Sequence, residues 1–113
     1  MSLLDQIISM LNTLGIPHEV GRFSDNPPDV FICIVPLVDD FAISGDDAPL
    51  HEAHHVRLSL HCTVDYGPTA KRVVAAALDA GMAISGRHYV EFDKETATHH
   101  YAIDVAKLIN MEV

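Results

Sequence analysis

The stretch that decides the fold is GIPHEVGRFSDNPPDVFICIVPLVDDFAISGDDAPLHEAHHVRLSLHC, from Gly15 to Cys62. Residues 30–37 are dense in β-branched side chains, which favours a strand. Residues 55–65 alternate between apolar and polar side chains, so we expect a second strand with one face in the core and one in water. Between them, residues 39–49 read DDFAISGDDAP, an acidic segment that predicts a long, exposed hairpin loop.

Helical patterns flank this stretch on both sides. Apolar residues recur at helical spacing after Ser2, a good N-cap, and the pattern stops at Gly15. A second helix opens at Gly67-Pro68, because proline is well tolerated in a first turn, and stops at Gly81. The remaining segments predict a short strand at residues 18–23, a turn at 24–28, and a final hairpin of residues 84–93 and 98–105.

The predicted order of elements is therefore α-β-β-β-α-β-β. Hairpin-length connections favour antiparallel neighbours, which gives an α+β fold: a mostly antiparallel, twisted sheet with two helices packed on one face. A length of 113 residues fits one domain spanning residues 1–113.

Periodicity also predicts which side chains face the core. In the second helix the expected apolar stripe is Ala70, Val73, Val74, Ala77 and Leu78. In the strands the expected inward rows are Val56, Leu58, Leu60, Cys62 and Val64, and then Tyr101, Ile103 and Val105.

The net charge and the two cysteines limit the kinds of partner and the cellular compartment that we expect. A net charge of −9 repels a phosphate backbone and an anionic bilayer, so we expect no nucleic-acid partner and no membrane partner. Cys33 and Cys62 lie within apolar strand patterns, and no basic leader precedes the first helix. We expect free, buried thiols in a reducing cytosol; a disulfide would require their two strands to be adjacent.

The sequence carries no signature of enzyme chemistry. It has no nucleophile elbow, phosphate loop, zinc-ligand pair of cysteines or paired-carboxylate motif. The chain has eight histidines, but neighbours such as His54 and His55, or His99 and His100, point to opposite faces of a strand and cannot both reach one ion. We therefore expect no catalytic residue, no cofactor and no metal site.

The strand at residues 30–37 is apolar on both faces. Ile32 and Ile34 point one way, and the alternate residues point the other way. Two helices can cover only one side of the sheet, so the other side is covered either by another subunit or by the chain's own loops. The acidic loop is either a solvated connection or an arm that reaches a neighbour. The predicted oligomer contacts are Phe31, Cys33, Val35, Phe41 and Ile43.

Several segments resemble a family of small siphophage and prophage tail proteins. They are Leu14-Gly15-Ile16-Pro17, Phe23, Pro27-Pro28, residues 30–35, Asp39-Asp40-Phe41 and the alternating strand at residues 56–62. The chain departs from the lysine- and glutamate-rich sequence of the family at residues 75–77 and in the histidine-rich strand.

The resemblance implies a tail-terminator or tail-completion component of the virion. Proteins of this kind cap the tail tube as a ring, commonly a hexamer, and form the surface to which the head connector docks. It implies a homo-oligomer that contacts other tail and head-connector proteins, located in the virion tail and, during assembly, in the cytoplasm of a bacterial host. The alternative is a small regulatory or ligand-binding α+β module, which would need a concave pocket with a few polar groups.

Overall fold

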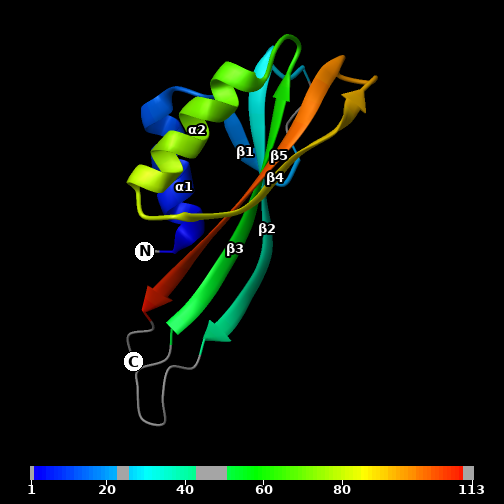
Figure 1. Cartoon of the computed structure of the whole chain (residues 1–113). Helices are drawn as coiled ribbons and strands as arrows, with labels where there is room; N and C mark the ends of the chain where they lie inside the picture. Colours follow the sequence, from blue (N-terminus) through cyan, green and yellow to red (C-terminus); the bar gives the residue numbers. More distant parts are fainter. Residues whose placement is uncertain (1, 23–25, 43–50, 111–113) are drawn as a thin grey trace.

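The computed structural model describes residues 2–22, 26–42 and 51–110, and it confirms the predicted order of elements (Figure 1). The elements are α1 (Leu3–Leu14), β1 (His18–Val20), β2 (Val30–Ala42), β3 (His51–Cys62), α2 (Gly67–Asp79), β4 (Ala83–Asp93) and β5 (Thr98–Asn110).

The described strands form one sheet in the order β1-β2-β3-β5-β4, in which β1 and β2 run parallel and the other neighbouring pairs run antiparallel. Both helices lie on the same side of this sheet, as Figure 1 shows. The predicted α+β class, the mostly antiparallel sheet and the common side for both helices are thus confirmed. Among the described residues, no helix is both long and apolar enough to cross a membrane.

Local sequence sets the ends of α1 as predicted. The Asp5 amide donates to the Ser2 hydroxyl at 3.1 Å, which satisfies one of the free N–H groups of the first turn. At the other end Gly15 adopts a left-handed conformation with φ of 73°, which a residue with a Cβ takes up at a cost.

The core lies between the helices and one face of the sheet. The helices contribute Leu3, Ile7, Leu11, Ala70, Val73 and Ala77, and the strands contribute Ile32, Ile34, Val56, Leu58, Leu60, Cys62, Ile103 and Val105. Most of the predicted inward rows are therefore confirmed. Two members are wrong: Leu78 is mostly exposed, because it lies at the edge of the α2 stripe, and Val64 is 67% exposed, because β3 has already ended.

The boundaries of β1 and β3 differ from prediction. β1 ends at Val20, because Gly21 takes a positive φ of 82°, outside the strand region. β3 begins at His51 and ends at Cys62. After this strand the Asp65 carboxylate accepts the Gly67 amide at the start of α2, so Asp65 belongs to the turn before the helix.

β2 continues to Ala42, past the predicted end at residue 37, because its pairing with β3 continues after a register shift between Pro36 and Val38. The Ile32 amide donates toward β1, so by alternation the nitrogen of Pro36 faces the edge that β1 no longer covers. Proline there removes no hydrogen bond from the ladder. The predicted loop therefore loses residues 39–42 to β2, and residues 43–50 lie outside the described part.

Cys33 and Cys62 are buried and are not joined by a disulfide, as expected. Their strands are adjacent, but the register places Cys33 opposite Ser59 and Cys62 opposite Val30. Because Cys62 joins the core beneath the helices and Cys33 points to the other face, the two thiols cannot meet.

Replacing Leu60 by Asp should lower the free energy of unfolding by at least about 3 kcal/mol, because it places an unpaired carboxylate between the sheet and the helices. The melting temperature should fall by more than about 10 °C. The control Val64→Asp, at an exposed position, should leave it nearly unchanged. A Leu60→Asp protein that melts within a few degrees of its parent contradicts the assignment of Leu60 to the core.

Candidate functional site

Three strand ends extend past the helices, and we call them the three-strand extension. They are the ends of β2, β3 and β5, paired through Asp40, Ala53 and Leu108. The helices have 12 and 13 residues, hence lengths of roughly 18–20 Å, whereas the molecule is 51 Å long. The helices therefore cannot cover the whole sheet, and Figure 1 shows these strand ends projecting beyond them.

Two polar side chains anchor the base of the extension to the helices. His54 is buried, and its Nδ1 accepts the amide of Leu3 at 3.4 Å at the start of α1, while its Nε2 lies 2.8 Å from a Glu52 carboxylate oxygen. Lys107 donates to the Gln6 side chain at 2.7 Å and to the Ala80 carbonyl at 2.9 Å. These contacts tie β3 and β5 to both helices just before the strands leave them.

The predicted oligomer contacts fall into three environments. Phe31 and Cys33 lie on the face away from the helices, where only 3% and 9% of each residue is exposed in the single chain. Val35 is half-buried on the same face. Phe41 lies in the extension opposite Glu52, and Ile43 lies outside the described residues.

The sheet face away from the helices is less exposed to solvent than the sequence predicts. Ser59 and Ala102 are buried there, and Arg57 donates two hydrogen bonds, of 2.8 and 3.0 Å, to the carboxylate of Asp104. The expectation that the alternate side chains of β3 face water is therefore wrong at the middle of this strand. Neighbouring strands supply this cover, which alternation in one strand cannot reveal.

Three rings stack across this face. The His61 ring lies 4.7 Å from the Phe31 ring on β2 and 4.4 Å from the His100 ring on β5, with nearly parallel planes. Burial, reinforced by the neighbouring His100, lowers the pKa of His61 to about 4. Burial also lowers the pKa of His100. Both imidazoles are therefore neutral at pH 7.

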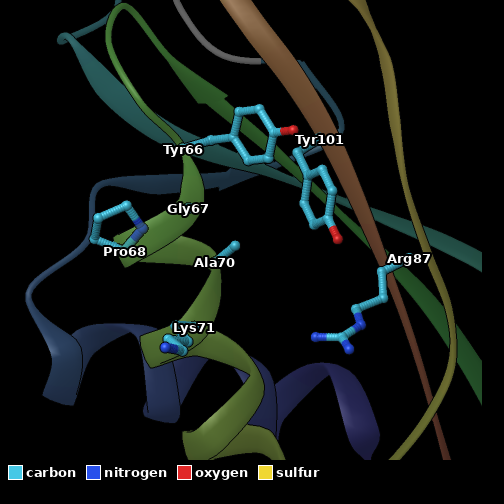
Figure 2. A pocket seen from close by; sticks show the side chains of 7 residues that line it. All are labelled: Tyr66, Gly67, Pro68, Ala70, Lys71, Arg87 and Tyr101. Carbon is cyan, nitrogen blue, oxygen red and sulfur yellow. The ribbon is translucent and has the colours of Figure 1, made fainter.

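A cleft of about 520 Å³ opens beside the start of α2 (Figure 2). Its lining consists of Tyr66, Gly67, Pro68, Ala70, Lys71, Arg87 and Tyr101. The Arg87 side chain reaches from β4 toward α2, and Lys71 stands on the helix itself (Figure 2). Both cations are exposed.

An aromatic cluster forms one side of this cleft. The rings of Tyr66 and Tyr101 stack at 4.7 Å, and Tyr89 lies 5.6 Å from Tyr66. The cluster continues to His99 and Phe92, whose rings are 5.2 Å apart. All three tyrosines of the chain belong to it, and Tyr89 and Phe92 are more than 40% exposed.

Sequence reasoning missed this cleft. The turn before α2 and the final hairpin carried its aromatic residues, but their meeting depends on the pairing of Tyr89 with Tyr101 across β4 and β5. The available signal was the concentration of all three tyrosines, with no tryptophan, in residues 66–101 of a chain that is only 6% aromatic.

The histidines separate as strand geometry predicts. His54 contacts α1, whereas His55 lies 3.9 Å from Asp40 on the other side of the sheet. His99 joins the tyrosine cluster, whereas His100 stacks on His61. Within residues 2–22, 26–42 and 51–110, no three His, Cys, Asp or Glu side chains gather in a way that could hold a metal ion.

The depressed pKa of His61 makes stability depend on pH. Between about 4 and 6.5 the unfolded chain binds a proton at His61 that the folded chain does not, so the free energy of unfolding falls as the pH drops through this window. Below about pH 4 both the folded and the unfolded chain carry the proton on His61, so the contribution of His61 no longer changes with pH. With solvent screening of a half-buried ring, we expect a loss of about 1 kcal/mol between pH 7 and 5.

Denaturant unfolding at the two pH values checks this expectation. His61→Phe keeps a ring in the stack but removes this titrating group, so it should reduce the pH dependence to the part that His100 contributes. His88→Phe, at an exposed position on β4, is the matched control and should retain it. Equal pH dependence in the wild type and in His61→Phe contradicts the assignment.

Comparison with known proteins gives a likeness at the level of the fold. No family model matches the chain, and no curated protein matches it. Among solved structures, the chain is similar to one chain of a structure described as the virion of a native gene transfer agent particle, with a TM-score of 0.50 and 13% sequence identity. The match covers 96% of this chain and 92% of that chain, so the two share a fold over nearly their whole lengths.

Proposed function

We propose that this protein is a structural component of a phage-like virion, with a tail-terminator or tail-completion role. Copies would form a ring at the head-proximal end of the tail tube and would contact tail and head-connector proteins there. The protein would reside in the virion tail and, during assembly, in the host cytoplasm. The observation that carries the proposal is the fold shared with a virion chain over 96% of the present chain.

The shape of the molecule supports an assembling protein. The three-strand extension projects from an elongated molecule, 51 Å long and only 24 Å by 23 Å across. Leu37, Val38 and Leu108 are about half exposed on or near it. Apolar side chains on a projecting element favour contact with another protein, because burying them on association is favourable.

The five predicted oligomer contacts remain in this proposal, but they contribute to the contact in different ways. Phe41 and Ile43 would insert into a neighbouring copy, and Val35 would lie at the margin of the contact. Phe31 and Cys33 are covered by their own chain and would support the contact from beneath. The stack of Phe31 on His61 would hold that support rigid.

The alternative of a ligand-binding module rests on the cleft beside α2. Small-molecule sites usually enclose most of the ligand and present a few polar groups at fixed positions. Here the two cations are exposed side chains at the margin of an open cleft. This arrangement favours a segment of another protein over an enclosed small molecule.

The proposed ring predicts that association depends on the hairpin. Purified wild-type protein should form closed rings in light scattering and negative-stain electron microscopy, either alone or on assembled tail tubes. Phe41→Ser with Ile43→Ser should weaken each contact roughly a hundredfold, because about 3 kcal/mol of apolar burial is lost.

The matched control is Val64→Ser with Leu78→Ser, which removes two exposed apolar side chains away from the extension. This control should associate like the wild type. A wild type that neither forms rings nor binds tail tubes overturns the proposed function. Equal association of the hairpin variant and the wild type removes Phe41 and Ile43 from the contact.

A further inference from the structure

The cleft beside α2 and the segment that joins β2 to β3 carry opposite charges. The hairpin between β2 and β3 carries Asp39, Asp40, Asp46 and Asp47, with no basic residue from position 39 to 50. The cleft beside α2 carries two of the chain's seven basic residues, Arg87 and Lys71. In Figure 1 α2 begins on the side of the molecule that lies away from the free ends of β2 and β3.

The cleft has the composition of a protein-binding hot spot. Tyrosine and arginine are the residues that most often dominate binding energy, because they combine a large apolar contact area with directed hydrogen bonds. Here Tyr66 and Tyr101 supply stacked rings, and Arg87 supplies the guanidinium beside them. The Asp65 carboxylate, which accepts the Gly67 amide at 2.9 Å, keeps its negative charge nearby but does not line the cleft.

The geometry points to one occupant for this cleft: the acidic hairpin segment, residues 39–49, of the next copy of the chain. This inference rests on the self-association in the proposed function and names the surface that receives it. Phe41 or Ile43 would lie against the Tyr66 and Tyr101 rings, and the aspartates would pair with Arg87 and Lys71. An acidic segment with apolar anchors matches an aromatic cleft with two cations in both chemistry and charge.

Intramolecular insertion is excluded by distance. Residues 43–50 link Ala42 to His51, which are paired, and a chain of this length that must return to its starting point can reach at most about 14 Å from it. By register, Arg87 and Tyr101 lie level with Leu58 and Leu60 of β3, roughly 23–30 Å along the strand from its free end at His51. The contact must therefore join two copies.

The placement of the two surfaces also gives the symmetry of the assembly. A hairpin and a cleft are different surfaces, so the contact is head-to-tail, and repetition closes into a ring when the rotation per copy allows it. Each contact also brings cations to aspartates, which offsets part of the repulsion between copies of net charge −9. At physiological salt the screening length is about 8 Å, so these local charges outweigh the distant ones.

A peptide of residues 38–51 tests the inference without requiring rings. It contains no tyrosine or tryptophan, and the protein has no tryptophan and carries all three tyrosines in the aromatic cluster at the cleft. Tyrosine fluorescence therefore reports on that cluster alone. We expect a saturable change in this fluorescence as the peptide is added to the wild-type protein.

Charge reversal sharpens the test. Arg87→Glu with Lys71→Glu should weaken peptide binding at least tenfold. A peptide with Asp46→Lys and Asp47→Lys should bind this variant and not the wild type, a result that misfolding cannot produce. The control Arg22→Glu with Lys94→Glu makes the same change in net charge at exposed positions outside the cleft and should bind the original peptide normally.

Mixing full-length proteins then tests the contact in assembly. The cleft variant alone and the Asp46→Lys, Asp47→Lys hairpin variant alone should fail to form rings, whereas their equimolar mixture should form them, because every contact in an alternating ring is complementary. Rings of wild-type protein without peptide binding, or equal peptide binding by wild type and cleft variant, overturn this inference and leave the proposed function intact. Peptide binding without rings or tail-tube attachment overturns the proposed function and leaves the cleft assignment intact.

Discussion

Pairing along the whole of β3 is the constraint on which the rest of the structure depends. All 12 of its residues have partners on both sides, in β2 and in β5. This register fixes the face of every side chain in the three central strands, since a slip by one residue would move the apolar row to the other side. Leu58 and Leu60 then join the core between the sheet and the helices.

One-sided helix cover has two consequences for the sheet. The opposite face needs its own means of excluding water, and it uses a stack of rings and an Arg57–Asp104 pair instead of aliphatic packing. The sheet is also longer than the helices, so its far end stands free. His54 and Lys107 lie near the point where helix cover ends: each contacts a helix, and Figure 1 shows the strand ends projecting past the helices.

The charge distribution follows the same axis. The net charge of −9 keeps copies apart in solution unless a specific contact offsets the repulsion. The exposed aromatic cluster and its two cations lie beside the start of α2, whereas Asp39 and Asp40 lie near the free end of β2. A compact, rounded molecule could bring these two regions together within one chain, whereas an elongated one cannot. The elongation therefore makes the two surfaces available to different neighbours.

Periodicity and turn chemistry in the sequence alone determined the order of elements, the sheet class, the ends of α1 and the core rows of β3 and β5, because these depend on contacts within one segment. The length of β2 could not be read the same way. Asp39 and Asp40 look like loop residues, and only their pairing with His54 and Ala53 across the ladder keeps them in the strand.

Tertiary structure alone decided what lies on the face away from the helices and at the cleft. Phe31 reads as an exposed contact until His61 of the next strand covers it, and Tyr89 reads as an ordinary strand residue until its register places it beside Tyr101 and Tyr66. The physical reason is the same for both. Alternation within a strand gives the side on which a residue lies, but the neighbour it meets there is set by registers between strands far apart in the chain.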